Sequence, residues 1–357
     1  MERRDAFELY TDYLVANQGL ATSTGLSALL DENLKHDYIS DSLAQQGLDQ
    51  KAFWKEVKPF VRKIENEESV ISIDDTIIKK PHSTENEVIN YHFDHTTGKS
   101  TKGINLLNFL LSSEYEQQIV NSPLAYHVVR KSQAYKDKDG KTKYKSEVSK
   151  NEVVLEQLRC LTFLNQVKYR YILFDSWFSS SKSLKYIHTK LEKVFVCPLK
   201  SNRLVALDLQ DKKEGKFVNV STLSFDSQEP LQVYVKGLEF PVSLVREVFK
   251  NKDRSTGVLY LISNDTSLTY DQLTTIYQKR WKVEEFHKSL KQNTLLGNSP
   301  TKMEVGQCNH IFASMLAYVQ LERLKVKERL NHFALKAKFH LVMLKAAFDQ
   351  LQVLKAA

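Results

Sequence analysis

The pattern of hydrophobic and polar positions divides the chain into segments of different character. The first sixty-odd residues have apolar side chains at helical spacing, as in Phe53, Val57, Phe60 and Val61. The pattern changes at SVISIDD (69–75), a β-branched run that predicts a strand ending in two carboxylates. We therefore expect a small helical bundle followed by a sheet.

The sheet region continues with alternating predicted strands and helices. VINYHFDH (88–95) and GINLLNFLLS (103–112) are separated by a turn-rich segment and predict antiparallel partners of the first strand. Four more elements are predicted here: a helix over 147–166, a short buried strand within 169–178, a helix over 181–191 and a buried strand over 193–199.

The last third of the chain changes character twice. Residues 200–265 alternate apolar and polar side chains, which predicts an antiparallel β unit. A long helix is expected over 270–293, because Thr269 and Gln272 have the spacing of a capping box. Amphipathic helices are expected over 305–357.

Composition narrows the class of protein. The 357 residues carry a net charge of +8 and 42% hydrophobic residues, enough for an ordinary core in two or three units. No apolar run approaches the roughly 20 residues of a membrane span, and MERRDAFELY lacks the apolar region of a secretory signal. The three cysteines are far apart, which disfavours disulfides and structural zinc. These features predict a cytosolic, mildly basic protein.

The basic charge is densest at residues 131–150, KSQAYKDKDGKTKYKSEVSK, around Gly140. A solvated hairpin tip or loop explains this stretch best, because acidic residues are interleaved with the lysines. A loop that contacts phosphates is the alternative.

Acidic residues occupy positions suited to catalysis. Asp74, Asp75 and Asp175 stand at the ends of two predicted core strands, where a sheet holds side chains at a crevice. On the predicted helix over 270–293, one face carries a phenol, a guanidinium, a carboxylate and an ammonium. At about 100° per residue these four side chains share an arc of roughly 60°. They are Tyr277, Arg280, Glu284 and Lys291.

That helix resembles a known family. YQKRWKVEEFHKSLK fits Y-x2-R-x3-E-x6-K, the YREK signature of bacterial insertion-sequence DDE transposases. IDDT (73–76) is similar to the family's first acidic motif and LFDSWF (173–178) to its second, in the expected order. The resemblance covers about residues 69–294.

The resemblance implies an α/β fold: an RNase H-like mixed sheet flanked by helices and interrupted by an antiparallel β insertion. Helical regions are expected at both ends. The predicted division is a helical N-terminal region (1–66), a first part of the catalytic core (67–199), a β-strand insertion (200–266), the Glu-bearing helix of the core (267–300) and a C-terminal helical region (301–357). Binding of terminal repeats by residues 1–66 is a hypothesis, because these helices carry no motif of the family.

The resemblance also implies a metal site. Asp74, Asp175 and Glu284 would hold two Mg²⁺ ions, with Mn²⁺ as a substitute, since hard cations prefer carboxylate oxygens. Neighbouring strand residues point to opposite faces, so only one of Asp74 and Asp75 can be a ligand. The family's Asp-x-Thr pattern favours Asp74.

By the same resemblance, Tyr277, Arg280 and Lys291 would hold the DNA backbone near the scissile bond. The implied function is a transposase that binds terminal inverted repeats, cleaves DNA and joins the ends to target DNA, as a homodimer in a synaptic complex. It would act in the bacterial cytoplasm, on the nucleoid, with no membrane partner. Two alternatives stay open: a metal-dependent RNase H-like nuclease, and an inactive, domesticated DNA-binding protein.

Overall fold

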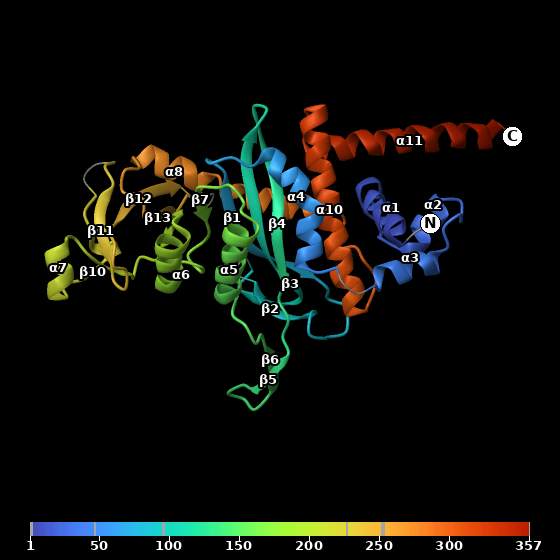
Figure 1. Cartoon of the computed structure of the whole chain (residues 1–357). Helices are drawn as coiled ribbons and strands as arrows, with labels where there is room; N and C mark the ends of the chain where they lie inside the picture. The colour runs from blue at the N-terminus through green and yellow to red at the C-terminus, as the bar shows by residue number, and fades with distance from the viewer. Residues whose placement is uncertain (1–2, 46–47, 95–96, 226–227, 251–253, 357) are drawn as a thin grey trace.

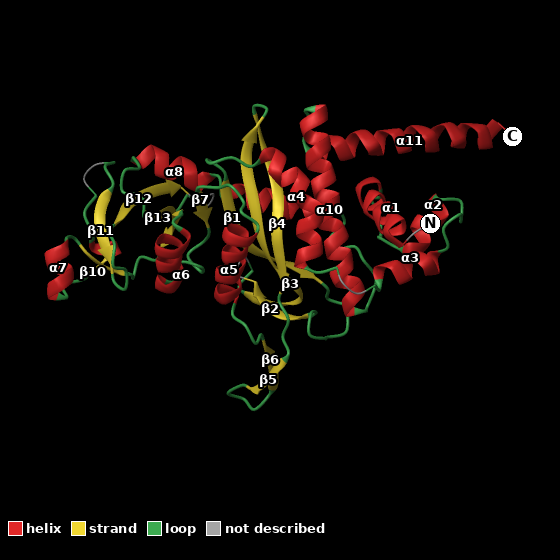
Figure 2. Cartoon of the chain, in the orientation of Figure 1, coloured by secondary structure: helices red, strands yellow, loops and turns green. Residues whose placement is uncertain are grey.

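One long twisted sheet forms the centre of the molecule, with helices on its faces (Figures 1 and 2). The computed structural model describes residues 3–45, 48–94, 97–225, 228–250 and 254–356. Within these residues, no helix is both long enough and apolar enough to cross a membrane.

The N-terminal region is helical, as predicted. Its helices are α1 (Arg3–Ala16), α2 (Ser23–Leu29), α3 (His36–Leu43) and α4 (Gln50–Ile64). The predicted apolar stripe of α4 is buried, and the helix packs on strand β4 (Gln118–Val128). Helix α1 packs on α10 (Glu304–Glu328) instead, so the chain's two ends meet in one helical layer.

The core sheet has the mixed arrangement expected of an RNase H-like fold. Its strands are β1 (Val70–Lys79), β2 (Asn90–Asp94), β3 (Lys99–Tyr115), β4, β7 (Tyr171–Leu173) and β8 (Val194–Leu199). β1, β7 and β8 run parallel to one another, while β3 is antiparallel to β1 and to both β2 and β4. The prediction for 88–95 is confirmed as β2, although His95 lies outside the described residues.

Two details of this sheet differ from the prediction. β1 does not end at the two aspartates but continues to Lys79, because its β-branched residues stay paired with β3. β4 was not predicted, since Pro123 argues against a strand. Pro123 is tolerated because it lies where the register between β3 and β4 shifts. β4 also pairs with β3 alone, so the N–H that proline lacks is not needed by a second neighbouring strand.

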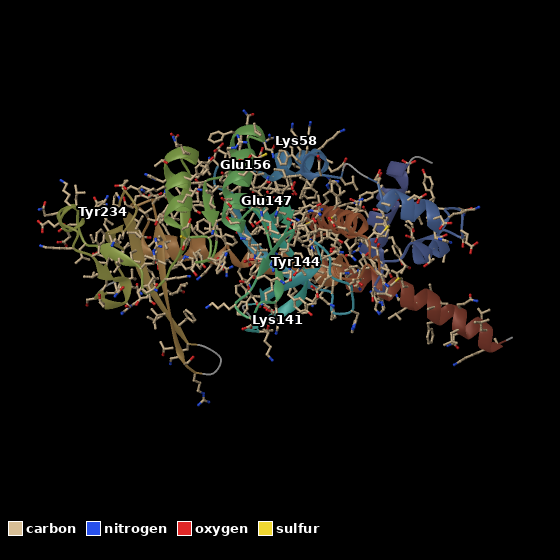
Figure 3. The ribbon with its side chains drawn as sticks, turned by 90° about the horizontal axis from the view of Figure 1, so that it is seen from below. Lys58, Lys141, Tyr144, Glu147, Glu156 and Tyr234 are labelled. Atoms are coloured by element: carbon tan, nitrogen blue, oxygen red, sulfur yellow. The ribbon has the colours of Figure 1, made fainter. Side chains whose placement is uncertain are left out.

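The helices between these strands follow the predicted order. They are α5 (Lys150–Arg159) with the π-helical turn η1 (Cys160–Leu164), and α6 (Ser181–Tyr186) with η2 (Ile187–Leu191). The lysine-rich stretch forms the hairpin of β5 (Gln133–Lys136) and β6 (Thr142–Lys145). Figure 3 looks onto this hairpin, with Lys141 and Tyr144 labelled; both are exposed.

The predicted β insertion continues the core sheet. It comprises β9 (Leu204–Ala206), α7 (Leu209–Glu214), β10 (Val218–Asn219), the 3₁₀ turn η3 (Val220–Thr222), β11 (Leu231–Val235), β12 (Val242–Lys250) and β13 (Thr256–Ser263). β13 pairs antiparallel with β8, so the inserted strands extend the same sheet outward. The division of the chain into domains stays a prediction.

The predicted single helix over 270–293 is two helices, α8 (Tyr270–Gln278) and α9 (Trp281–Asn293). The predicted capping box at Thr269 and Gln272 is confirmed. Between the helices the backbone tightens to 3₁₀ hydrogen bonds: the Arg280 N–H donates to the Tyr277 carbonyl at 2.9 Å, and the Val283 N–H donates to the Arg280 carbonyl at 3.0 Å. α10 and α11 (His332–Ala356) complete the chain.

Candidate active site

Two strands place the aspartates at one level of the sheet. β1 pairs with β7 from Val70 to Ser72, where Ser72 lies opposite Leu173. Two residues further on, Asp74 on β1 and Asp175 after β7 stand at equal offsets, just beyond the parallel pairing. The carboxyl ends of parallel strands open there to a crevice, the usual place for a site in such sheets.

Asp74 faces helix α9. Its Oδ2 lies 3.9 Å from Nη1 of Arg280 and 4.0 Å from Nδ1 of His287. Burial raises the pKa of Asp74 to about 7, the Arg280 guanidinium opposes this rise, and the charges of Asp75 and Asp175 add to it. Burial therefore outweighs the favourable charge of Arg280 at this carboxylate.

Asp75 points to the opposite face, toward α5. Its Oδ2 accepts a hydrogen bond from Nδ2 of Asn105 at 2.6 Å and an ion pair from Nζ of Lys150 at 2.8 Å. These partners already satisfy the carboxylate. The opposite orientation of neighbouring strand residues is therefore observed: Asp75 is paired with Lys150 at 2.8 Å, whereas Asp74 has Arg280 at the longer distance of 3.9 Å.

Asp175 lies in the turn after β7. Its Oδ1 accepts the backbone N–H of Trp177 at 2.9 Å, and burial raises its pKa. Together with Asp75 it lines a cavity of about 730 Å³ that also holds Lys150 and Lys200. The lining thus combines carboxylates with ammonium groups, one of which, Lys150, is paired with Asp75 at 2.8 Å, and ammonium groups beside the acids suit a polyanion.

The YREK-type residues of α8 and α9 converge on Arg280. Its Nη2 donates to Oε1 of Glu284 at 2.7 Å, and its guanidinium stands 5.7 Å from the centre of the Tyr277 ring. Lys291 lies further along α9, where its Nζ donates to Oγ1 of Thr76 at 2.6 Å. Thr76 is on the same face of β1 as Asp74, so all four residues border the same side of the sheet.

Sequence reasoning missed a polar contact that crosses the sheet to α9. Asn108, directly opposite Asp74 on β3, donates through Nδ2 to Nε2 of His287 at 2.9 Å. Burial lowers the pKa of His287 to about 3, so the ring is neutral, and its proton sits on Nδ1, which faces Asp74. The Glu-x-x-His spacing of Glu284 and His287 was the available signal.

The carboxylates are chemically suited to a divalent cation but are not arranged around one. Among the residues that the structure describes, no three His, Cys, Asp or Glu side chains are placed to hold a metal ion. Glu284 is not turned toward a metal position because its carboxylate forms an ion pair with Arg280. Burial is the main cause of the raised pKa of Asp74, and the charges of Asp75 and Asp175 add to it; this added repulsion is the observation that fits a cation, since a cation would relieve it.

The mixed sheet and the acidic groups at the ends of its strands are consistent with an enzyme that acts on phosphodiesters, and the class itself comes from the family comparison. The sequence matches the family model described as DDE superfamily endonuclease over residues 1–216, and the chain belongs to this family. No curated protein matches the chain. Membership implies an enzyme of nuclease or transposase type with DNA as substrate, and endonucleases of this superfamily typically use divalent metals. The matched residues include Asp74 and Asp175, whereas the YREK-type residues lie beyond them.

Proposed function

We propose that this protein is the DNA transposase of a bacterial insertion sequence. It would bind the terminal inverted repeats of its element as a homodimer, cleave the ends and join them to target DNA. The proposal rests on family membership and on one observation: Arg280 lies between Asp74 and Glu284. A phosphate clamp and two acids from distant segments thus share one site. Its workplace would be the bacterial cytoplasm, on the nucleoid.

In this proposal Asp74, Asp175 and Glu284 hold two Mg²⁺ ions, or Mn²⁺ in their place. When bound, these ions lower the pKa of the attacking water and stabilise the charge of the leaving oxygen. The water attacks the scissile phosphorus, the bond to the 3′ oxygen breaks, and a 3′-hydroxyl and a 5′-phosphate result. That hydroxyl then attacks a target phosphorus, the bond from this phosphorus to the target strand's own 3′ oxygen breaks, and a joined strand and a free target 3′-hydroxyl result.

The chain's other residues position the DNA. Arg280 forms bidentate hydrogen bonds with a phosphate after it leaves Glu284, and Lys291 adds a point charge beside β1. Burial raises the pKa of Tyr277, so its phenol keeps its proton and donates to a phosphate oxygen. His287, held by Asn108, orients the Asp74 carboxylate.

The test follows nicking and strand transfer on a labelled duplex carrying the element's end, with Mg²⁺. We expect Glu284→Gln and Asp175→Asn each to reduce both reactions by more than roughly 100-fold, because even outer partners of a metal ligand contribute 10- to 100-fold. Glu285→Gln is the matched control: Glu285 is the next residue, is exposed, and forms an ion pair with Lys282 at 2.8 Å. Strand transfer at the wild-type rate by Glu284→Gln would overturn the proposal.

The family description favours one second candidate, an endonuclease that cleaves without joining. The same assay separates the two. Nicks without joined products identify the nuclease, and specific binding without nicks by the wild-type protein identifies an inactive DNA-binding protein.

A further inference from the structure

The distal part of α11 extends away from the body of the molecule (Figure 1). The base of the helix is anchored: Leu335 and Lys336 are buried, and Nζ of Lys336 donates to the carbonyls of Val15 and Asn17 at 2.7 Å. Residues 341–356, here called the arm, have a different character. Eight large apolar side chains of the arm are 43–66% exposed, among them Leu344, Phe348 and Leu351.

The arm is too apolar for a helix in water. Burying an aliphatic side chain removes roughly 60–120 Å² from water, so eight of them at about half exposure leave on the order of 400 Å² uncovered. A pair of copies in which each contributes an arm and an equal facing surface would then reach the roughly 800 Å² that one partner contributes to a stable protein interface. A helix with apolar residues on most of its circumference is normally buried against other protein.

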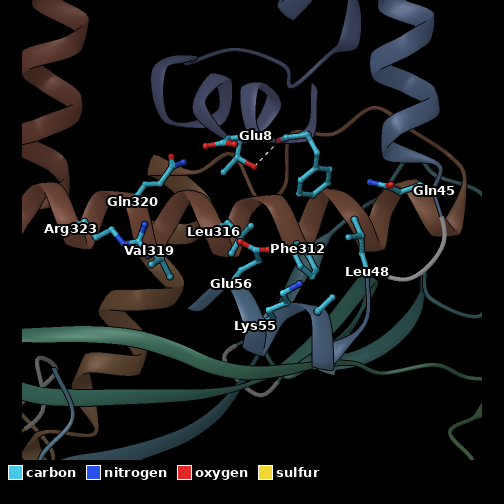
Figure 4. Close-up of a pocket in the computed structure, with 13 residues that line it drawn as sticks. Glu8, Gln45, Leu48, Lys55, Glu56, Phe312, Leu316, Val319, Gln320 and Arg323 are labelled. Carbon is cyan, nitrogen blue, oxygen red and sulfur yellow. Dashed lines mark hydrogen bonds between the residues drawn. The ribbon is translucent and has the colours of Figure 1, made fainter. Parts of the chain in front are cut away.

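The same chain carries a groove that matches the arm. Two adjoining cavities of about 400 and 410 Å³ run along α10 between α1, α4 and the base of α11, and they share Gln320 and Arg323. Figure 4 shows the first cavity, with Phe312, Leu316 and Val319 of α10 at its floor. From Phe312 to Leu324 the groove is roughly 18 Å long and the arm roughly 24 Å, at 1.5 Å per helical residue, so most of the arm fits along it.

Charge favours this groove over a second arm as the arm's partner. The groove is lined by three acids, Glu8, Asp12 and Glu56, against two bases, Lys55 and Arg323. The arm carries two lysines, Lys345 and Lys355, against one acid, Asp349. A net negative groove therefore meets a net positive helix, whereas two arms would bring like charges together.

We propose that the arm of one copy docks in the α1–α4–α10 groove of a second copy, and that the exchange is reciprocal. Both surfaces belong to one chain, so a two-fold pair covers both at once and forms a closed dimer. The arm would complete a four-helix layer with α1, α4 and α10. This contact would be the interface of the homodimer on which the proposed function relies. The experiments that test it use neither DNA nor metal.

The first experiment measures the mass of the full chain by light scattering and sedimentation from about 1 to 50 μM, conditions in which an interface of standard size is populated. We expect a dimer. Leu344→Glu with Leu351→Glu should raise its dissociation constant by on the order of 30-fold or more, because carboxylates would enter an apolar groove. Val342→Glu is the matched control: Val342 is 64% exposed and lies about 160° around the helix from Leu344. Both variants change residues that are exposed in the single chain, so the helical content by circular dichroism should be unchanged in each, while the thermal midpoint should fall only in the double variant, which loses the stabilisation by dimerisation.

The second experiment locates the contact. Carbodiimide cross-linking of an equal mixture of ¹⁴N and ¹⁵N protein should yield mixed-isotope links from Lys345 or Lys355 to Glu8 or Glu56. If the mixed-isotope links join only one arm to another arm, the groove is not the docking site of the arm. A protein that is still monomeric at 50 μM would overturn the proposed exchange of arms between two copies. Neither result bears on the proposed nuclease chemistry. Conversely, if the wild-type protein fails to nick DNA, the proposed dimer is unaffected.

Discussion

Asp74→Asn should stabilise the metal-free protein, although it removes a residue proposed to be essential. Burial and two neighbouring acids raise the pKa of Asp74 from 3.8 to about 7. A difference of about 3 between the folded and unfolded pKa corresponds to about 4 kcal/mol of stability lost when the group is ionised, since each pKa unit is 1.36 kcal/mol. This penalty is already net of the attraction of Arg280 at 3.9 Å. Asparagine escapes the penalty but still buries an amide, so we expect a net gain of about 2 kcal/mol or more.

The sign depends on pH. Below about pH 4 the Asp74 carboxyl is protonated in the folded and the unfolded chain, and the penalty is absent. Between about pH 4 and 7 it is ionised only when unfolded, so stability falls as pH rises, and above pH 7 the full penalty applies. The raised pKa of Asp175 acts in the same direction.

Thermal unfolding in buffer with a chelator, at pH 8 and pH 5, measures this effect. The midpoint of Asp74→Asn should exceed that of the wild type by several degrees at pH 8 and by less than half as much at pH 5. Asp75→Asn is the control of opposite sign, because it gives up charge-assisted bonds to Asn105 and Lys150 and should lower the midpoint. An Asp74→Asn protein no more stable than the wild type at pH 8, or equally stabilised at both pH values, would refute the reasoning.

Three further outcomes are expected. Arg280→Ala should raise the Mn²⁺ affinity of the DNA-free protein by roughly 10-fold, because it frees Glu284 and removes a positive charge, and it should weaken DNA binding. Electron paramagnetic resonance titration measures the Mn²⁺ affinity, and gel shifts measure DNA binding. An unchanged Mn²⁺ affinity would contradict the role given to the ion pair. His287→Asn keeps an amide nitrogen near the position of Nδ1, whereas His287→Gln keeps an amide nitrogen near the position of Nε2. We expect His287→Asn to retain more nicking and more Mn²⁺ binding than His287→Gln. Equal losses in the two variants would show that His287 contributes packing alone. Lys291→Met should reduce the slope of log DNA affinity against log salt by about 1, and an unchanged slope would exclude a phosphate contact by this lysine.

The elements that the sequence predicted well are those whose signals are local. The capping box at Thr269 depends on residues three apart, and β8 is a short apolar run closed by its own flanks. Elements decided by distant partners were predicted less well. The length of β1 past Asp75 depends on pairing with β3, and β4 contains Pro123, whose local signal is the reverse of a strand.

The same distinction holds for the candidate site. The ion pair of Arg280 and Glu284 follows from their spacing of four along the chain, and it persists although the helix breaks just before it. The approach of Arg280 to Asp74 needed the family resemblance, since 206 positions separate them by their numbers. Asn108 carried no signal of its own: it matters because the register of β3 sets it opposite Asp74. Contacts across a sheet depend on register, which a one-residue slip would invert.

Arg280 gives the proposed site a built-in order of assembly. In the DNA-free protein its guanidinium neutralises Glu284 and part of the charge on Asp74, so a divalent cation must compete with it. A DNA phosphate competes for the same guanidinium. If the phosphate draws Arg280 from Glu284, the carboxylate becomes available to a cation, and each ligand raises the affinity for the other by one common factor. On this reasoning the carboxylate cluster forms only when DNA is bound, which protects other phosphodiesters from a permanently loaded nuclease. It follows that the effect of Arg280→Ala on Mn²⁺ affinity should largely disappear in the presence of DNA.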